Sequence, residues 1–230
     1  MPPGIMDNLD NWRRFKAKTT PAVVPLANEF YDDVPVNSRV VDFGCAWGRI
    51  SFELYDQGYS VVGFDINENE IACARQHAKE ISALESKLRF DVGNATNLPY
   101  PDRSFDAGVM VAFMVTIVDP QARTQVLKEA YRILRDGGVL YISDFGQTWN
   151  NEKYRRRYEE HFPITKEKGT FIVTDSHDIG GKELYRCHHY TEEELRSLIE
   201  PHFKIVSWKE TEFTTPSGNV SNGFKIIASK

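Results

Sequence analysis

Two acidic residues and two glycines in the first third of the chain have the types and spacing to bind a ligand. Asp42, Gly44 and Gly48 follow one apolar run, and Asp65 closes a second apolar run. The glycines permit a tight turn and a close approach of the backbone to a ligand, because no Cβ obstructs either. A carboxylate at Asp42 would repel phosphate but suits a cationic amino group or sulfonium. Asp65 follows Gly44 by about 20 residues, the spacing at which a carboxylate accepts hydrogen bonds from ribose hydroxyls.

The elements that must position these residues are two strands with a helix between them. Residues 40–43 and 60–65 are rich in apolar and β-branched side chains, which is typical of parallel strands buried on both faces. Apolar residues then recur at i and i+4, so we expect a helix over residues 49–57 that ends at Gly58. Strand, glycine turn and helix together predict a mononucleotide-type pocket at the carboxyl end of a strand.

A purely structural interpretation competes at these positions. The glycines could serve a plain turn, and Asp65 could cap the helix that follows it. However, Asn67 and Glu70 already supply an N-x-x-E pattern close to a capping box. We therefore expect Asp65 to be free to bind a ligand.

The glycine pattern also separates two classes of nucleotide-binding protein. A dinucleotide fingerprint reads G-x-G-x-x-G, whereas this chain has D-x-G-x-x-x-G over residues 42–48. A nicotinamide-dependent oxidoreductase would use the same fold class, but its fingerprint is missing here. Residues 40–51, with the acid that ends the next strand, resemble motif I and its successor in the class I S-adenosylmethionine-dependent methyltransferases.

Two later segments carry the same resemblance, which covers residues 40–145 well. Residues 93–106 are similar to the family's G-D-A-x-x-L-P-F…S-F-D signature, with Asn94 at the usual aspartate position. An asparagine can still accept a hydrogen bond from an adenine amine, although a simple Asx-turn is the alternative. Residues 133–140 resemble the L-[KR]-P-G-G-x-L segment, with Asp136 in place of the proline.

The resemblance implies an α/β fold with a Rossmann-like, doubly wound, seven-stranded sheet whose last strand is antiparallel. It further implies one methyltransferase domain over residues 1–230. The parts would be an N-terminal helical lid at 1–35, a cofactor-binding core at 36–145, an acceptor-cover insertion after the fifth strand at 146–190, and a closing helix and hairpin at 191–230. We expect two helical pieces over residues 7–32, broken around 19–21, and a β-hairpin in the insertion around 178–181.

The cofactor implied by the resemblance is S-adenosylmethionine, with S-adenosylhomocysteine as the product. The residues implied to contact it lie in the lid, the glycine turn and the ends of the strands that follow. They are Trp12, Asp42, Gly44, Cys45, Ala46, Gly48, Asp65, Ile66, Asn94, Ala95 and Val111.

The reaction implied is in-line transfer of the sulfonium methyl group to a nitrogen or oxygen atom, or less favourably carbon, of an acceptor. Much of the catalysis can come from aligning the two reactants in a dry site. If a base is required, the best candidates are His188 and His189, because a neutral imidazole titrates in the right range. Packing within the hairpin is the competing interpretation. Residues 155–157 are three consecutive arginines, interpreted as a solvated face, with binding of an acidic acceptor as the alternative.

Composition limits the partners. The chain has 28 basic and 33 acidic side chains and a net charge of −5, so a basic nucleic-acid footprint is absent overall and we expect a small-molecule acceptor. Three separated cysteines without a C-x-x-C pair favour a reducing cytoplasm and argue against a zinc site. No segment reads as a signal peptide or membrane span, so no membrane association is expected. The sequence leaves open whether the protein forms a homodimer.

Two further alternatives are left by the sequence. A non-catalytic S-adenosylmethionine-binding protein would keep Asp42 and Asp65 without transferring a methyl group. A methyltransferase that acts on a protein or peptide would share the same cofactor residues. An acceptor screen separates these alternatives from a small-molecule enzyme.

Overall fold

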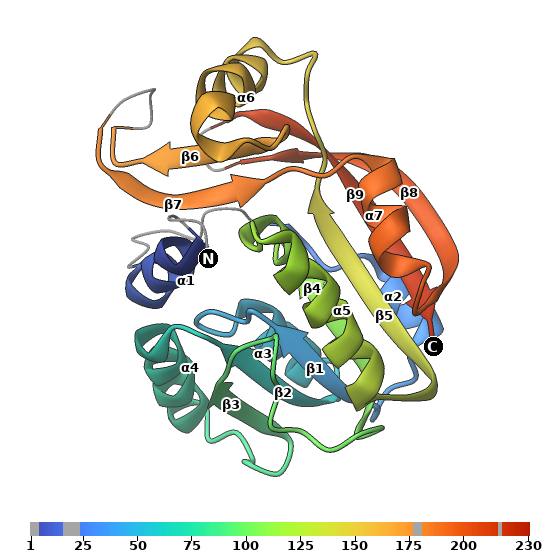
Figure 1. The fold of residues 1–230 in the computed structure, drawn as a ribbon. Coiled ribbons are helices and arrows are strands. Elements are labelled where there is room, and N and C mark those ends of the chain that lie inside the picture. Colours follow the sequence, from blue (N-terminus) through green and yellow to red (C-terminus); the bar gives the residue numbers. More distant parts are fainter. Residues whose placement is uncertain (1–4, 16–23, 177–180, 216–217) are drawn as a thin grey trace.

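A seven-stranded sheet organises the computed structural model, which describes residues 5–15, 24–176, 181–215 and 218–230 (Figure 1). Its strands are β1 (Arg39–Phe43), β2 (Ser60–Asp65), β3 (Leu88–Val92), β4 (Phe105–Val111), β5 (Leu134–Phe145), β8 (Lys204–Thr214) and β9 (Val220–Ser229). They are arranged in the order β3-β2-β1-β4-β5-β9-β8. Neighbours from β3 to β5 pair in parallel, and β9 pairs antiparallel with both β5 and β8. The predicted doubly wound sheet with an antiparallel last strand is confirmed.

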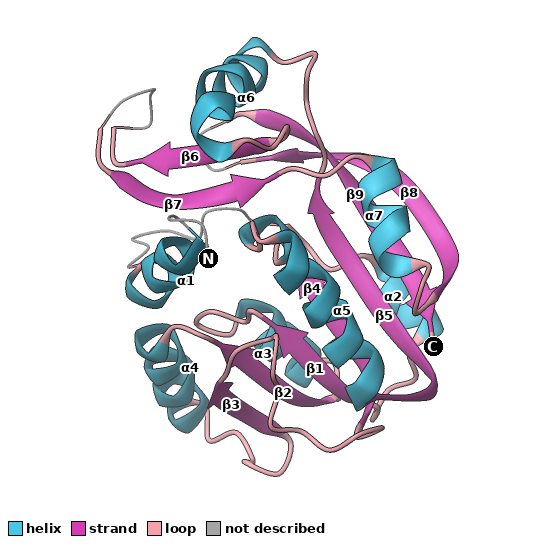
Figure 2. Ribbon diagram, in the orientation of Figure 1, coloured by secondary structure: helices cyan, strands magenta, loops and turns pink. Residues whose placement is uncertain are grey.

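Helices lie on both faces of this sheet (Figure 2). The helices of the described residues are α1 (Ile5–Arg14), α2 (Asn28–Asp33), α3 (Arg49–Asp56), α4 (Glu68–Glu80), α5 (Pro120–Ile133), α6 (Glu152–Thr165) and α7 (Glu192–Ile199), with a 3-10 turn η1 at Met114–Thr116. Of these, α1 and α6 lie beside the smaller sheet described below. The predicted break around residues 19–21 lies outside the described residues.

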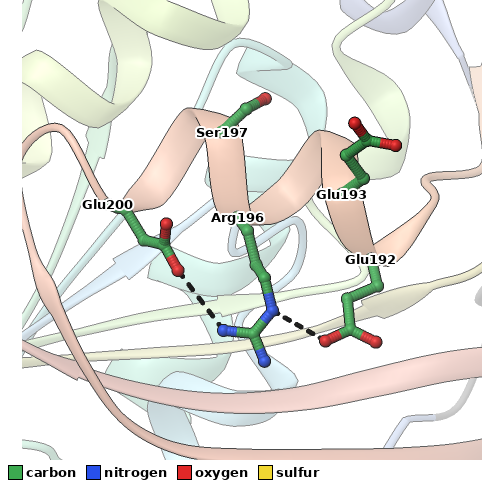
Figure 3. Close-up of a pocket in the computed structure, with 5 residues that line it drawn as sticks. All are labelled: Glu192, Glu193, Arg196, Ser197 and Glu200. Carbon is green, nitrogen blue, oxygen red and sulfur yellow. Dashed lines mark hydrogen bonds and ion pairs between the residues drawn. The ribbon is translucent and has the colours of Figure 1, made fainter.

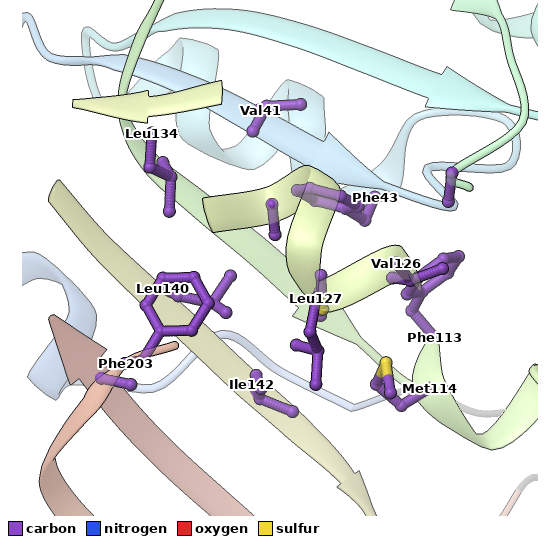
Figure 4. Packing of buried hydrophobic residues seen from close by; sticks show 14 of the residues in the cluster. Val41, Phe43, Phe113, Met114, Val126, Leu127, Leu134, Leu140, Ile142 and Phe203 are labelled. Carbon is purple, nitrogen blue, oxygen red and sulfur yellow. The ribbon is translucent and has the colours of Figure 1, made fainter. Parts of the chain in front are cut away.

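Two hydrophobic clusters divide the core by face, because successive side chains of a strand point to opposite sides. Val41 of β1 packs with α5 and α7, in the cluster that Figure 4 shows around Phe43 and Leu127. Val40, the residue before it, packs in the second cluster with α2, α3 and α4. Both faces of the central strands are therefore buried, as their near-continuous apolar sequences predict.

The fifth strand begins earlier than its sequence suggests. Gly137 and Gly138 end a helical pattern and the β-prone residues 139–143 follow, so the sequence predicts that this strand begins at residue 139. In the structure Leu134 already pairs with Phe105, and the ladder then shifts register before Val139 pairs with Ala107. Residues 134–138 therefore belong to β5, although the sequence predicts the end of a helix and a loop there.

The insertion forms a separate two-stranded antiparallel sheet of β6 (Thr170–Thr174) and β7 (Glu183–His188). A helix lies along each of its outer edges (Figure 1). The N–H of Ile172 in β6 donates to Nδ1 of His161 in α6, and the N–H of Arg186 in β7 donates to Oδ1 of Asn8 in α1. The two strands lie on either side of residues 178–181, around which the hairpin was predicted, and residues 178–180 of that turn lie outside the described residues.

Two features are absent from the described residues. None of the helices there is both long and apolar enough to cross a lipid bilayer. No group of three or more histidine, cysteine, aspartate or glutamate side chains there could hold a metal ion.

Candidate active site

The glycine turn lies between β1 and α3 and adopts the backbone conformation that its residues allow. Gly44, Ala46 and Gly48 all have positive φ angles, of 66°, 48° and 96°. A Cβ at Gly44 would collide with the ring of Phe113, and one at Gly48 would lie 2.8 Å from the ring of Phe90. Both glycines are therefore required by sterics as well as by φ, whereas Ala46 accepts a left-handed conformation that costs a non-glycine residue energy.

Asp65 ends β2 and faces the glycine turn. Its Oδ2 accepts a hydrogen bond of 2.9 Å from the N–H of Ala46, and its Oδ1 accepts one of 2.8 Å from the N–H of Asn67. Asp65 therefore has two backbone partners in the protein, one in the glycine turn and one at the start of α4. A carboxylate offers about four acceptor positions, so these two bonds orient the group and leave capacity for two ribose hydroxyls.

Asp42 is buried beneath the same turn. Its side chain is 2% exposed, and Oδ2 accepts a hydrogen bond of 2.7 Å from the hydroxyl of Ser51 in α3. Burial raises the pKa of Asp42 to about 7, which the Ser51 hydrogen bond and the charge of Arg49 only partly oppose. The carboxyl group thus lies close to its titration point at neutral pH, and a cation above the turn would favour its ionised form.

Two neighbours of these acids are also among the predicted contacts. Cys45 is buried, its N–H donates to the carbonyl of Phe64, and burial raises the pKa of its thiol well above the usual value. Ile66 directly follows Asp65 and is half-buried.

Asn94 and Ala95 lie just beyond the end of β3. Oδ1 of Asn94 accepts hydrogen bonds from both the N–H and the hydroxyl of Thr96, at 3.1 and 3.0 Å. This is the Asx-turn that the sequence left as an alternative. These two bonds use only the side-chain oxygen, and the NH₂ group of an asparagine can donate where an ionised aspartate could only accept.

Trp12 of α1 lies between the start of α4 and the hairpin. The side-chain Nδ2 of Asn67 donates to the carbonyls of Trp12 and Phe15, at 3.0 and 2.7 Å. On its other side the indole ring lies 4.2 Å from the ring of Tyr185 in β7, measured between centroids. Its Nε1 is buried, and no acceptor for it lies within the described part of the chain.

Val111 ends β4, and the loop after it is held by a buried acid. Val111 is half-buried, and Ala112 beside it has a positive φ of 51°. Asp144 of β5 is fully buried and accepts hydrogen bonds from the N–H groups of Val115 and Phe145, at 3.1 and 2.8 Å. Burial raises the pKa of Asp144 to about 7, although these backbone donors oppose the shift.

His188 is enclosed by polar groups in the interior. Its ring is 0% exposed, and Nδ1 lies 2.7 Å from the hydroxyl of Thr170 and 3.2 Å from Oε2 of Glu167. Its Nε2 lies 3.7 Å from Oε2 of Glu194 in α7. Glu167 in turn receives two hydrogen bonds from Arg123 of α5, which join the cover to the core.

His189 lies in an aromatic environment. Its ring stacks on Phe145 at 5.4 Å, and Nδ1 forms a hydrogen bond of 2.8 Å with the hydroxyl of Tyr158. Burial lowers the pKa of His189 to about 3, so the imidazole is neutral throughout the physiological range. The predicted cofactor residues other than Trp12 thus lie at or just beyond the ends of β1, β2, β3 and β4, and both histidines are buried at the end of β7.

Comparison with known proteins identifies the family. A solved S-adenosylmethionine-dependent methyltransferase from Methanosarcina mazei is 38% identical, superimposes with a TM-score of 0.85, and aligns over 90% of this chain and 99% of its own. The chain belongs to the class I S-adenosylmethionine-dependent methyltransferases. A family model described as a methyltransferase domain matches residues 40–138 of this methyltransferase.

Curated relatives resemble mainly the cofactor-binding part. Methyltransferase GfsG of Streptomyces halstedii is 35% identical over 49% of this methyltransferase and 39% of its own length. The ubiquinone/menaquinone biosynthesis C-methyltransferase UbiE of Dinoroseobacter shibae is 35% identical over 60% of this chain and 54% of its own. The methyltransferase thus spans about half or less of the curated relatives it matches.

A depression on the surface of α7 lies apart from these residues. Glu192, Glu193, Arg196, Ser197 and Glu200 line it (Figure 3). Nε of Arg196 bonds Glu192 at 2.7 Å and its Nη1 bonds Glu200 at 3.3 Å, both one helical turn away. The lining comes from a single helix and includes no predicted cofactor residue, so we assign no ligand to it.

Sequence reasoning missed the residues that hold the cover in place. Asn8, Arg123 and Glu167 each form hydrogen bonds to residues distant in the chain. The available signal for Arg123 was its spacing of three and seven positions from Val126 and Ala130, which places it on the apolar face of the helix. A charged side chain on such a face is seldom fully buried without a partner. Asn67 was interpreted only as a helix cap. No pattern in the sequence indicates that its side-chain NH₂ group also donates to the carbonyl of Trp12.

Proposed function

We propose that this protein transfers the methyl group of S-adenosylmethionine to a nitrogen or oxygen atom of a small-molecule acceptor, with carbon as the less favoured acceptor. The observation that carries the proposal is the geometry at Asp65. Its carboxylate is oriented by the N–H groups of Ala46 and Asn67, at the point where β1 and β2 end beside the glycine turn. A carboxylate fixed at this place is suited to the hydroxyls of a ribose.

The other residues around the turn also fit this cofactor. Asp42 lies beneath the turn, where its ionised form would favour the cationic end of the cofactor. The buried Nε1 of Trp12 has no acceptor within the described residues, and a buried donor usually has one. A ligand between the turn and the hairpin would supply that acceptor. We assign Gly44, Cys45, Gly48, Ile66, Asn94, Ala95 and Val111 to the remaining cofactor contacts.

S-adenosylmethionine supplies an electrophilic methyl group on a sulfonium. In the proposed reaction a lone pair of the acceptor forms the new bond to the methyl carbon, and the carbon–sulfur bond breaks with its electron pair kept by sulfur. The protein's part is to hold both reactants in line and to exclude water. For acceptors that must lose a proton, we propose His188 or His189 as the base, or as the residue through which a base is positioned.

Each of the four segments of the chain has a proposed role in this reaction. We propose residues 1–35 as a lid, 36–145 as the cofactor-binding core, 146–190 as the acceptor cover and 191–230 as the closing elements. The contacts of α1 with both Asn67 and Tyr185 support the lid assignment. The name of the UbiE relative links that protein to quinone biosynthesis, which supports a small-molecule acceptor. Free thiols at all three cysteines are consistent with a cytoplasmic location.

Titration calorimetry with S-adenosylmethionine and S-adenosylhomocysteine tests the cofactor assignment. We expect micromolar binding by the wild type and a loss of about tenfold or more in Asp65→Asn, because hydrogen bonds to an ionised carboxylate are strong. Asp56→Asn is the matched control, since Asp56 is exposed at the end of α3. If the wild type binds neither ligand, the proposal is wrong and nicotinamide cofactors should be titrated next. An acceptor screen then separates an enzyme from a non-catalytic binding protein.

A further inference from the structure

One side chain bonds the ends of two helices beside the proposed cofactor site. Oδ1 of Asn67 accepts hydrogen bonds from the N–H groups of Asn69 and Glu70, at 3.1 and 3.3 Å, and so caps the start of α4. Its Nδ2 donates to the carbonyls of Trp12 and Phe15, at 3.0 and 2.7 Å, at the end of α1. The last carbonyls of a helix lack partners within that helix. The buried amide of Asn67 thus serves one helix with its oxygen and the other with its nitrogen.

The same residue is bonded to the acid that we assign to the ribose. The N–H of Asn67 donates to Oδ1 of Asp65 at 2.8 Å, and only Ile66 separates the two residues in the chain. The other carboxylate oxygen of Asp65 accepts from Ala46 in the glycine turn. The end of α1 is therefore attached to a residue that is itself in contact with the proposed ribose ligand.

Other contacts of α1 join it to the hairpin of β6 and β7. Oδ1 of Asn8 accepts from the N–H of Arg186 at 2.6 Å, and the ring of Trp12 lies 4.2 Å from that of Tyr185 between centroids. Figure 1 shows α1 between the hairpin and α4. Toward the core, Nδ2 of Asn8 donates to the carbonyl of Thr116 at 3.2 Å. At its C-terminal end, α1 meets the core through the two bonds from α4.

Two neutral hydrogen bonds suit a contact that opens and closes. Each contributes modestly to stability, because the separated groups bond to water instead. The buried ion pair between Arg123 and Glu167 is harder to separate, because each charge would lose its partner. The end of α1 can therefore leave α4 while that ion pair keeps the cover attached to the core. Opening of such covering elements often limits the rate at which an enzyme releases its ligands.

We propose that Asn67 is a positioning residue that fastens α1 beside bound S-adenosylmethionine and sets the rates at which the cofactor enters and leaves. This inference rests on the proposed function, because it takes Asp65 as the ribose contact. The two bonds join protein groups and involve no ligand atom, so they form in the free and the bound protein alike. The end of α1 must then open before the cofactor enters as well as before it leaves. Loss of the bonds should raise both rate constants, whereas loss of a ligand contact raises only the dissociation rate constant.

Two substitutions remove the NH₂ donor and keep the cap. Asn67→Asp and Asn67→Ser both retain an oxygen that caps α4, since asparagine, aspartate and serine are similarly good N-caps. Neither side chain can donate two hydrogen bonds to the end of α1. Agreement between the charged and the uncharged variant excludes an effect of charge on Asp65. Asn69→Asp and Asn69→Ser are the matched controls, because Asn69 is exposed two positions further along the chain.

Stopped-flow tryptophan fluorescence follows the association of S-adenosylhomocysteine, with Trp12 and the exposed Trp47 of the glycine turn as reporters. The slope and intercept of the observed rate against ligand concentration give the two rate constants, and calorimetry gives the dissociation constant. We expect both rate constants to rise about 5–100-fold in the Asn67 variants, the range for two neutral hydrogen bonds. The dissociation constant should change by less than about threefold. The Asn69 variants should match the wild type. Hydrogen exchange in peptides from α1 should be faster in the Asn67 variants alone.

Three outcomes would overturn the inference. They are unchanged rate constants and hydrogen exchange in both Asn67 variants, faster dissociation with an association rate that stays the same or falls, and equal effects of the Asn67 and Asn69 substitutions. A merely destabilised site does not bind its ligand faster, so a loss of stability does not imitate the expected result. Calorimetric binding of S-adenosylhomocysteine by the wild type is the separate check. If it fails, the proposed function is wrong. If it persists while the rates stay unchanged, only the role of Asn67 is wrong.

Discussion

The hydroxyl of Ser51 donates a hydrogen bond of 2.7 Å to Oδ2 of Asp42, and this bond joins the first turn of α3 to the end of β1. It is a neutral donor to a carboxyl group that is 2% exposed. Burial raises the pKa of Asp42 to about 7. A buried acid poised near neutrality beneath a ligand turn is a site where ligand binding and protonation are coupled.

Binding of S-adenosylmethionine should therefore depend on pH. Between pH 6 and 7.5 the ionised fraction of Asp42 rises, while the α-amino group of the ligand, with a pKa near 7.7–8.0, stays largely cationic. We expect the dissociation constant to fall about five- to tenfold over this interval. Calorimetry at several pH values measures it. In Asp42→Asn this dependence should disappear, and a variant that retains the full slope would contradict the assignment.

The same residue should destabilise the ligand-free protein at alkaline pH. A carboxyl group whose folded-state pKa is raised favours the fold below its unfolded pKa, and that contribution is lost as pH rises through about 7. Asp42→Asn should therefore stabilise the ligand-free protein at pH 8 by about 1–2 kcal/mol, while it weakens cofactor binding. Urea unfolding at pH 5 and pH 8 measures this. An equal effect at both pH values would count against a titrating Asp42.

The strands and the turn that carry the proposed cofactor residues could be predicted because their signals are local. The apolar runs that form β1, β2 and β4, and the glycines between β1 and α3, specify strand and turn within a few neighbouring residues. The bonds made by Asp65 could not be predicted in this way. They depend on Ala46 adopting a left-handed conformation that turns its N–H toward β2. Likewise, burial and not sequence spacing sets the ionisation of Asp42.

Residues 146–190 were predicted as an insertion, but their contacts with the rest of the chain were not. Arg123 and Glu167 are 44 positions apart, and Asn8 and Arg186 are 178 positions apart. Such pairs arise from packing between elements, which no local pattern specifies. For the same reason the sequence did not show that one of the three arginines at residues 155–157 is half-buried. It is Arg157, whose guanidinium carbon lies 5.6 Å from the ring centroid of Phe171.

The ion pair between Arg123 and Glu167 should hold the cover to the core. Arg123 is 5% exposed, and Nη1 and Nη2 bond the two carboxylate oxygens of Glu167 at 2.6 and 2.9 Å. Glu167→Gln should cost about 2–4 kcal/mol, because it leaves a buried guanidinium without its counterion. That corresponds to a fall in Tm of about 4–16 °C for a chain of this size. Scanning calorimetry measures it.

Glu159→Gln is the matched control for that change, since Glu159 is exposed on α6 and loses the same charge. The pH dependence adds a second check. Burial opposes ionisation of Glu167, but hydrogen bonds from His188 and Arg123 outweigh it and hold its pKa below the usual value. Its stabilising contribution is therefore present above about pH 4.5 and lost as pH falls. A similar Tm for both variants at neutral pH would show that the ion pair holds nothing in place.

Single-turnover kinetics test the base hypothesis for His188 and His189. A residue that removes a proton in the transition state contributes about 10²–10⁴-fold to the rate. On the base hypothesis, His188→Asn or His189→Asn should lower the methyl-transfer rate by that factor with an unchanged affinity for S-adenosylhomocysteine. Because the pKa of His189 is lowered to about 3, a base at that position should give a rate that does not titrate near pH 6.5. An unchanged rate in both variants would remove the hypothesis and leave the two rings as packing residues.

The indole N–H of Trp12 provides the sharpest test of whether α1 closes over a ligand. Its Nε1 is buried without an acceptor in the described residues, while its ring lies against Tyr185. Trp12→Phe keeps an aromatic ring at that position, removes the donor and makes the side chain smaller, a change of size that the Trp149→Phe control shares. If a ligand accepts this hydrogen bond, binding of S-adenosylmethionine or of an acceptor should weaken about three- to tenfold. The stability of the ligand-free protein should change little, because removal of an unsatisfied buried donor offsets part of the packing lost with the larger ring.

Trp149→Phe is the control, because Nε1 of Trp149 donates to Oε1 of Gln147 at 2.7 Å and its side chain is 39% exposed. That variant should lose no ligand affinity. Calorimetric titration of both variants with S-adenosylmethionine, and then with an acceptor in the presence of S-adenosylhomocysteine, shows which ligand Trp12 contacts. Equal affinities of Trp12→Phe and the wild type for every ligand would mean that α1 is a structural helix, and the lid assignment would have to be abandoned.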